Sequence, residues 1–342
     1  MNDIDFVIPW VDGNDPEWQK RKAQRLGTAE TDDRPQRYRD WGLLKYWFRG
    51  VEKFTPWVRK VWFICDQDPP AWLNRDCPKL QIVRHEEYIP KQYLPTFSSN
   101  PIELHLHRIR GLSEQFVYFN DDMFILSPLE KEFFFRDGLP LDSALLNVIP
   151  TTDLTKDSSY QRIITVHLNN AEYANRDYDF RSAVRRNWSK WYNLRYGSSM
   201  IRNLMLSIWP RFVGFYEPHL PQAFLKKSFE EAWEADRDIL EETSGHPIRN
   251  DLDINQWLIR HRQLIEGKFI PRKPLKNAVF DLKYQGDKAA DTIYGQRIPM
   301  ICINDGIMEE AEYKGIRSSL ISAFESILPE QCAFERGAEA SK

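Results

Sequence analysis

Two adjacent carboxylates, Asp121 and Asp122, come directly after the apolar run FVYF and the polar residue Asn120. Such a run predicts a buried strand, and the acidic pair would then lie at its carboxyl end. Carboxylate oxygens are ligands for Mg²⁺ or Mn²⁺, which commonly bridge a protein to the phosphates of a substrate. A solvated turn or a helix N-cap would use the same residues, so the spacing leaves a structural and a catalytic interpretation open.

The segment ELHLHRI, which precedes this strand, contains His105, His107 and Arg108. If the segment is helical, His105 and Arg108 are three positions apart and share a face, whereas His107 points elsewhere. The planar guanidinium of an arginine can bind a diphosphate through two hydrogen bonds. Two histidines packed beneath a sheet are the alternative. A zinc site is not expected, because no clear third ligand lies nearby in the sequence.

Two later loops contain further residues that could take part in chemistry. His219 lies between prolines in the segment PHLP, and an imidazole that titrates near neutrality can accept the proton of an attacking hydroxyl. Asn304 and Asp305 follow the apolar run IPMICI, so another predicted strand ends in an acidic loop. Ordinary loop and turn chemistry explains each of these residues equally well.

Strand and helix patterns alternate before the acidic pair, as in an α/β unit with a mostly parallel sheet. Strands are predicted at Ile4–Val11, Val58–Cys65 and Leu80–Arg84, and helices at Trp18–Leu26 and Arg39–Phe54. The strands end near Asp12, Asp66 and His85, and such sheets bind ligands beyond the carboxyl ends of their strands. We therefore expect these polar residues to converge. Pro9 predicts that the first strand is an edge strand or contains a bulge.

The second half of the chain is predicted to be mostly helical. Helical or apolar-faced segments are expected at Val166–Trp191, Arg202–Trp209, Ser228–Glu242, Asp253–Glu266 and Lys314–Leu328, and strands at Ser143–Pro150 and Ile298–Ile303.

The composition is that of a globular protein. The net charge of −3 comes from 47 basic and 50 acidic residues, so the overall charge does not favour a nucleic-acid partner. Four cysteines without a CxxC pair predict reduced thiols and a cytoplasmic protein. No apolar run is long enough for a spanning helix, which leaves peripheral membrane association open. The absence of GxGxxG, GxxxxGK[ST], GxSxG and HExxH motifs argues against several large enzyme classes.

Three segments together resemble a known family: DIDFVIPWVDGNDPEW, RYRDWGLLKYWFRGVEKFTPWVRKVWFICDQDPPAWL and LPTFSSNPIELHLHRIRGLSEQFVYFNDDMFI. They are similar to the first two conserved regions of the Stealth family, and FYEPHLPQAF and ICINDG resemble the third and fourth. Members are sugar-1-phosphate transferases of bacterial capsular and cell-surface polysaccharides, related to the catalytic core of GlcNAc-1-phosphotransferase. The resemblance implies transfer of a hexose 1-phosphate from a UDP-sugar to a hydroxyl of a polysaccharide or lipid-linked glycan, with release of UMP.

The resemblance also implies roles for individual residues. The positions that match the first two regions are Asp12, Gly13, Arg39, Asp40, His105, His107, Arg108, Asn120, Asp121 and Asp122. Asp12 and Gly13 would lie at the nucleotide end of the site. His105, His107 and Arg108 would bind the donor phosphates. Asp121 and Asp122 would bind Mg²⁺ or Mn²⁺, assisted by Asn304 and Asp305 from the fourth region. His219, from the third region, would be the general base.

The expected fold is a GT-A-like, Rossmann-type α/β sandwich with a largely helical insertion. Residues 1–150 would form the nucleotide-sugar-binding core, 151–280 the insertion that contributes the acceptor side and His219, and 281–342 the return to the core with a final helix. A cytoplasmic protein at the inner face of the membrane would fit this function. Two alternatives remain: a metal-dependent glycosyltransferase that releases UDP, and a non-catalytic carbohydrate-binding protein that uses the many aromatic side chains.

Overall fold

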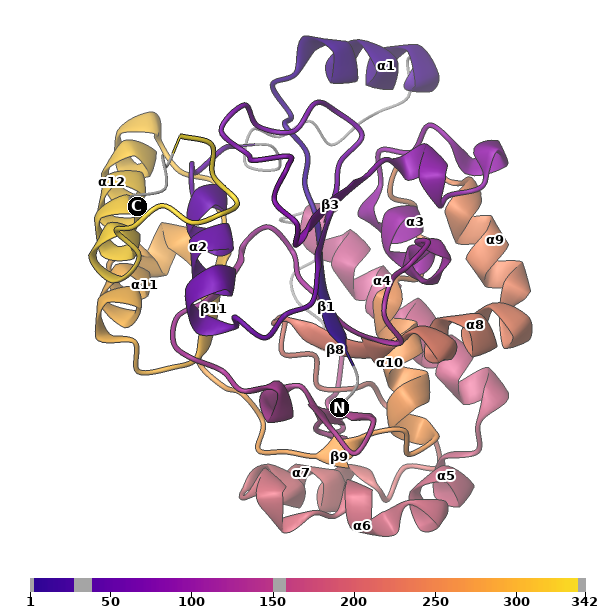
Figure 1. Ribbon diagram of the computed structural model, residues 1–342. Helices are drawn as coiled ribbons and strands as arrows, with labels where there is room; N and C mark the ends of the chain where they lie inside the picture. Colours follow the sequence, from indigo (N-terminus) through magenta and orange to yellow (C-terminus); the bar gives the residue numbers. More distant parts are fainter. Residues whose placement is uncertain (1–2, 28–38, 150–157, 338–342) are drawn as a thin grey trace.

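A five-stranded sheet lies at the centre of the computed structural model, which describes residues 3–27, 39–149 and 158–337 (Figure 1). The strand order is β3-β2-β1-β4-β8. Its strands are β1 (Ile4–Pro9), β2 (Val61–Ile64), β3 (Leu80–Val83), β4 (Gln115–Tyr118) and β8 (Gln222–Leu225). The first four run parallel, and β8 runs antiparallel to β4. The predicted mostly parallel, GT-A-like α/β fold is confirmed.

Both faces of this sheet are buried, because successive side chains of each strand enter different cores. In β1, Phe6 and Ile8 pack into one hydrophobic cluster, whereas Val7 packs into another on the opposite face. In β4, Val117 belongs to the first cluster and Phe116 to the second. Such doubly buried strands need apolar residues at consecutive positions, which explains the continuous apolar runs in the sequence.

Helices cover the two faces of the sheet (Figure 1). One face packs against α2 (Leu44–Phe54), α11 (Leu282–Gly295) and α12 (Glu310–Ile327). The other packs against α3 (Ser99–Leu104), α4 (Ser158–Asp177), α8 (Lys226–Ala235), α9 (Arg237–Gly245) and α10 (Gln256–Ile265). A third apolar cluster lies beneath α5 (Phe180–Arg186), α6 (Trp188–Trp191) and α7 (Ser199–Leu206). Helix α1 (Pro16–Leu26) follows β1.

Two small sheets complete the described structure. One has the order β10-β11-β5 and comprises β5 (Met123–Ile125), β10 (Val279–Asp281) and β11 (Met300–Asn304). The other has the order β6-β7-β9 and comprises β6 (Phe135–Arg136), β7 (Leu139–Asp142) and β9 (Ile270–Pro271).

Several local predictions need correction. Strand β1 is central, and Pro9 is its last residue rather than a sign of an edge. The helix expected at Ser228–Glu242 is two helices, because Asp236 adopts a non-helical conformation between α8 and α9. The strand expected from Ser143 is reduced to one bridge between Leu146 and Phe215, and its last residue, Pro150, lies outside the described residues.

Strand β8 was not predicted, although it joins the central sheet from within the segment expected to be a helical insertion. Its four residues, QAFL, carry no clear strand pattern, and its pairing with β4 spans more than a hundred positions of the chain. Helix α11 was also missed. The four cysteines are free and buried, as expected. Among the described residues, no helix combines the length and apolar character needed to span a membrane.

Candidate active site

The antiparallel pairing of β8 with β4 brings two distant segments to one edge of the sheet. Tyr118 at the carboxyl end of β4 pairs with Gln222 at the amino end of β8. Residues that follow β4 and residues that precede β8 therefore lie at the same edge. Asp122 approaches this edge from one strand and His219 from the other. His219 has a positive φ of 45°, which is uncommon for a residue with a side chain.

A second antiparallel pairing adds the end of β11 to this edge. Met123 pairs with Cys302, and the backbone N–H of Ile303 donates a hydrogen bond of 2.9 Å to the carbonyl oxygen of Asp122. The chain that continues beyond Ile303, Asn304 and then Asp305, is thereby directed toward the turn that contains Asp121. The structure thus brings together the two acidic segments that the sequence placed far apart.

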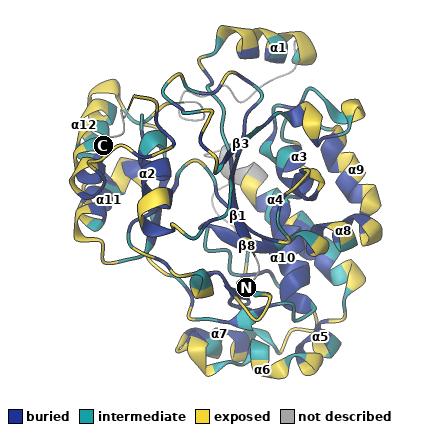
Figure 2. Cartoon of the chain, viewed as in Figure 1, coloured by how far each residue is buried: buried dark blue, intermediate teal, exposed yellow. Residues whose placement is uncertain are grey.

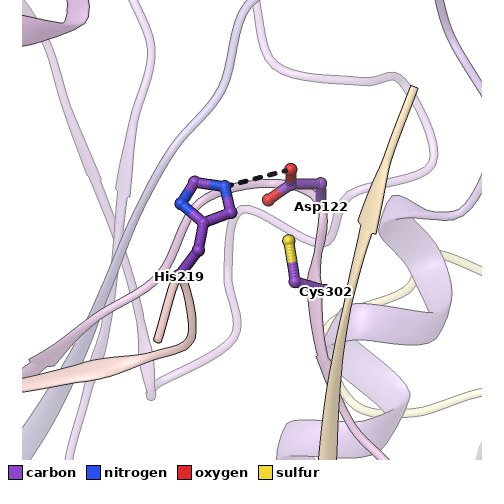
Figure 3. Close-up of side chains that lie close together, drawn as sticks. All are labelled: Asp122, His219 and Cys302. Atoms are coloured by element: carbon purple, nitrogen blue, oxygen red, sulfur yellow. Dashed lines mark ion pairs between the residues drawn. The ribbon is translucent and has the colours of Figure 1, made fainter. Parts of the chain in front are cut away.

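Asp122, His219 and Cys302 form the centre of the site (Figure 3). The His219 Nε2 atom lies 3.9 Å from Asp122 Oδ2, which is too long for a hydrogen bond but close enough for an ion pair. One ligand atom of each of the three residues lies within 4.8 Å of the other two. The side chains of His219 and Asp122 remain 43% and 29% exposed, so both can be reached from solvent.

The acidic turn holds two carboxyl groups whose ionised forms are disfavoured by their surroundings. Desolvation raises the pKa of Asp122 to about 6, although hydrogen bonding from Cys302 opposes the rise. Desolvation and the neighbouring Asp122 carboxylate also raise the pKa of the more exposed Asp121. Within the described part of the chain, Asp122 Oδ1 is buried and has no hydrogen-bond partner. A cation bound here would satisfy this atom and relieve the repulsion.

Asp305 forms the side of the site together with two residues of the second predicted region. Arg39 Nη1 lies 3.3 Å from Asp305 Oδ1, and its guanidinium stacks over Tyr313. The Tyr313 hydroxyl donates a hydrogen bond to the carbonyl oxygen of Asp40. Burial raises the pKa of Asp305 despite the opposing charge of Arg39. Asp305 Oδ2 is a second buried oxygen without a partner among the described residues.

The loop after β1 is joined to the loop after β2 by a pair of hydrogen bonds. The Asp12 N–H donates to Gln67 Oε1, and Gln67 Nε2 donates back to the Asp12 carbonyl, both at 2.7 Å. The Asp12 carboxylate accepts a hydrogen bond from the N–H of Asn14, and Gly13 is buried. The loop therefore stands at the carboxyl end of β1, as predicted. Its contact with a nucleotide stays a prediction.

The predicted phosphate-binding histidines require a correction. His105 is fully buried, its Nε2 lies 3.0 Å from the Ser244 hydroxyl, and its ring packs between Tyr93 and Trp233. Burial lowers the pKa of His105 to about 3. A side chain enclosed in this way cannot touch a nucleotide, so the alternative of a histidine packed beneath the sheet holds.

His107 and Arg108 lie in the same layer of the protein. The expected helix ends at Leu104, His105 is its C-cap, and a short 3₁₀ turn, η4 (Leu106–Arg108), follows. His107 is 9% exposed, its ring stacks at 6.0 Å from that of Phe229, and burial lowers its pKa to about 3. The Arg108 guanidinium lies over the ring of Trp233. The structure therefore does not place this group with Asp122.

Sequence reasoning missed a polar cluster behind His219. Glu217 accepts a hydrogen bond of 2.8 Å from His261 Nε2 and lies 2.5 Å from His167 Nδ1. Despite the desolvation of Glu217, these two histidines lower its pKa to about 2. The cluster links α4 and α10 to the loop that carries His219. Glu217 could have been noticed as the second residue before His219, whereas the two helical histidines have no local signal.

The fold and the site define a class of protein: a GT-A-like α/β domain with a histidine and acidic residues at the carboxyl edge of its sheet. Family models match residues 2–29 as Stealth protein conserved region 1 and residues 37–141 as Stealth protein conserved region 2. The chain belongs to the Stealth family, as its resemblance indicated.

Three relatives match almost their whole length. The capsular polysaccharide phosphotransferase WcwK of Streptococcus pneumoniae is 37% identical, with 98% of this chain and 99% of the relative covered. The receptor polysaccharide phosphotransferase WefC of Streptococcus oralis is 39% identical, with 98% and 100% covered. The exopolysaccharide phosphotransferase cps2G of Lactiplantibacillus plantarum is 38% identical, with 98% and 96% covered.

Proposed function

We propose that this protein is a polysaccharide phosphotransferase that transfers a hexose 1-phosphate, such as GlcNAc 1-phosphate, from a UDP-sugar to a glycan hydroxyl. The acceptor oxygen bonds to the sugar-proximal phosphorus, the bond from this phosphorus to the bridging oxygen breaks, and UMP leaves. The product is a phosphodiester in a capsular or cell-surface polysaccharide. Support comes from the names of the three relatives and, above all, from the meeting of His219 and Asp122 at the sheet edge.

His219 is our candidate for the general base. Its ring is accessible, and desolvation lowers its pKa, so that the imidazole is neutral at neutral pH and its free nitrogen can accept the acceptor's proton. Asp122, 3.9 Å from Nε2, would stabilise the protonated ring. The left-handed backbone at His219 and the two flanking prolines restrict where the ring can point.

Asp121, Asp122, Asn304 and Asp305 are our candidates to hold Mg²⁺ or Mn²⁺. They offer the oxygen donors that these ions prefer, and two of their oxygens are buried without partners among the described residues. When bound, the ion would neutralise charge on the donor phosphates. We do not assign Cys302 as a ligand: burial raises the pKa of its thiol well above the usual value, and a protonated thiol is a poor ligand for a hard cation.

The donor is proposed to be surrounded by Arg39, Asp40, Asp12, Gly13 and Asn120. Arg39 takes over the role of donor-phosphate ligand, because it is the arginine that reaches the acidic edge in this structure, through its ion pair with Asp305. Its guanidinium offers further N–H groups for a phosphate.

The decisive experiment identifies the nucleotide that is released. The purified protein is incubated with Mg²⁺, a glycan acceptor and a panel of UDP-sugars, and the products are separated by ion-exchange chromatography. We expect UMP, together with a phosphodiester signal in the ³¹P spectrum of the glycan. Release of UDP would instead establish the alternative, a metal-dependent glycosyltransferase, and would refute our proposal.

The acceptor and the cellular location belong to the same proposal. The acceptor is a polysaccharide or a lipid-linked glycan, and the reaction takes place in the cytoplasm at the inner face of the membrane. The four free, buried cysteines are compatible with a reducing compartment. A protein that only binds carbohydrate would release neither nucleotide in the experiment above.

A further inference from the structure

Helix α7 presents its apolar side to solvent. Ile201, Leu204 and Met205 are 58%, 51% and 67% exposed, and Ile208, just beyond the helix, is 71% exposed. Their spacing of three, four and seven positions forms a single stripe along a helix. A stripe of this kind normally faces the core of a globular protein. In α7 the buried residues are instead Ser199 and Asn203.

Hydrogen bonds fix this inverted orientation. The Asn203 side chain is 1% exposed, and its oxygen accepts a bond of 2.7 Å from the N–H of Leu146. Its nitrogen donates to the carbonyl oxygens of Ala144 at 2.7 Å and Trp191 at 2.8 Å. If the helix were turned over, the N–H of Leu146 and the carbonyl oxygens of Ala144 and Trp191 would lose these hydrogen bonds. Leaving buried polar groups without partners is costly. The apolar stripe is therefore held outward by the fold.

Exposed apolar side chains continue onto the neighbouring segments. Trp188 of α6 is 64% exposed, Leu194 is 85% exposed, and Trp209 is 55% exposed. Helices α5, α6 and α7 lie together at one end of the molecule (Figure 1), and the ribbon there is largely exposed (Figure 2). We call this end the basic apolar surface. Its apolar part consists of the stripe of α7 with Trp188, Leu194 and Trp209.

The same region is strongly basic. Between Phe180 and Tyr216 the sequence contains arginine and lysine but no aspartate or glutamate, although the whole chain has a net charge of −3. The exposed cations of this region are Arg181, Arg185, Arg186, Arg195 and Arg211. The basic apolar surface therefore combines a hydrophobic area with an excess of positive charge, of which Asp179 at the N-cap of α5 offsets a part beside Arg181 and Arg185.

We propose that the basic apolar surface docks on an anionic lipid bilayer. An exposed apolar stripe flanked by tryptophan and arginine is the arrangement that inserts at the boundary between lipid headgroups and acyl chains. Each cation near an anionic membrane surface adds about 1 kcal/mol of attraction. A second copy of this chain is a less suitable partner, because a symmetric contact would place the arginines of both copies against one another.

The surface is connected to the candidate active site by a short path. The Arg202 guanidinium of α7 lies 5.5 Å from the centre of the Tyr216 ring, and Tyr216 is three residues before His219. Three residues span at most about 11 Å. The loop that precedes His219 therefore contacts α7 through Tyr216 and Arg202. The docking itself does not depend on the proposed reaction.

Flotation with vesicles tests the proposal. The full-length protein is mixed with vesicles of phosphatidylcholine alone, or of equal parts of phosphatidylcholine and phosphatidylglycerol, and centrifuged through a density gradient. We expect the protein to float with the anionic vesicles only, and to be released by high salt, which screens the charges. The His219→Asn variant should float like the wild type, so this result is independent of the catalytic proposal.

Two variants locate the contact. Replacing Leu204, Met205 and Ile208 by serine should weaken vesicle binding at least about tenfold, because these side chains would lose their apolar contact. Replacing Arg185 and Arg186 by glutamine should weaken it roughly 25-fold, about fivefold for each cation. The matched controls replace exposed residues elsewhere: Leu252, Tyr284 and Tyr294 by serine, and Arg237 and Lys314 by glutamine. All these positions are exposed, so folding should be preserved.

Three results would overturn the proposal. The first is wild-type protein that fails to float with anionic vesicles. The second is flotation that the control substitutions reduce as much as the variants of the surface. The third is a dimer in light scattering that the triple serine variant dissociates while vesicle binding is absent, since the surface would then be an interface between two copies.

Discussion

Two groups of histidine and neighbouring polar residues occur in this protein, and they have opposite surroundings. His219 and Asp122 stand at the carboxyl edge of the central sheet, with partly exposed side chains and a buried carboxylate oxygen that lacks a partner among the described residues. His105 and His107 are enclosed between helices and aromatic rings. The sequence suggested a ligand-binding role for both groups. Accessibility distinguishes the two groups, because His105 Nδ1 and His107 Nδ1 are also buried without a hydrogen-bond partner among the described residues. We propose that the accessible group is functional and that the buried, stacked rings contribute to packing.

The comparison also shows why chemical type and proximity in the sequence are weak guides. His105 precedes the acidic pair closely, yet its ring turns into the helical layer and contacts Trp233. His219 is about a hundred residues away and reaches Asp122 because β8 pairs with β4. The following predictions test whether this division between a reactive edge and a structural layer is correct, beginning with the largest expected effect.

Removal of divalent metal should abolish activity altogether. If Asp121, Asp122, Asn304 and Asp305 hold Mg²⁺ or Mn²⁺, EDTA should stop release of UMP, and added Mg²⁺ or Mn²⁺ should restore it. The His105 layer contains no predicted metal ligand, so circular dichroism should show an unchanged fold in EDTA. Activity that survives exhaustive chelation would contradict the metal assignment.

His219→Asn should lower turnover about 10²-fold or more, the usual scale for loss of a general base. Asparagine tolerates the left-handed backbone at this position, so the fold and the KM for the donor should change little. Steady-state kinetics measure both quantities, and a thermal melt confirms folding. If turnover stays near normal, His219 is not the general base. The proposed reactive role of the carboxyl edge of the central sheet would then be contradicted.

His105→Ala should act on stability instead of chemistry. Loss of the ring between Tyr93 and Trp233, and of its contact with Ser244, should reduce the free energy of unfolding by about 2 to 4 kcal/mol. Urea unfolding followed by circular dichroism measures this loss. His105→Phe should recover part of it by restoring the stacked ring. If His105 were a ligand of the donor phosphates, both substitutions would instead raise the KM for the UDP-sugar and leave stability unchanged.

Asp122→Asn should have the smallest effect on stability. It should increase the free energy of unfolding. The pKa of Asp122 is raised to about 6 in the folded protein, so folding is favoured by this group below its unfolded pKa of about 4. This contribution is lost as the pH rises through about 6. At pH 7 the ionised carboxyl therefore opposes folding, and asparagine should stabilise the metal-free protein by about 1 kcal/mol, a value reduced for its partial exposure.

Urea unfolding in EDTA at pH 7 and at pH 4 measures this effect, which should shrink at the lower pH. Asp238→Asn is the control, because its side chain is 69% exposed and its replacement should change stability by less than about 0.5 kcal/mol. A destabilised Asp122→Asn protein would mean that the carboxyl at the edge is a structural group like His105.

Much of the scaffold was predictable because local patterns report it. The apolar runs of β1, β2 and β4 follow from burial on both faces of a parallel sheet. The acidic turn at Asp121 and Asp122 is marked by the polar residues that end the run of β4. Strand β8 was not predictable, because its short segment becomes a strand only through pairing with β4. The contacts of Glu217 with His167 and His261 join three separate segments, and no local pattern marks them.

The sequence by itself determined the class of fold, the family and the chemical groups available, because apolar periodicity and motif residues are properties of short segments. The tertiary structure decided which of these groups meet. It enclosed His105 by ending a helix at Leu104, it brought His219 to Asp122 by an antiparallel pairing, and it turned the apolar stripe of α7 outward by burying Asn203. Each outcome depends on contacts between distant parts of the chain, whose geometry only the packed structure contains.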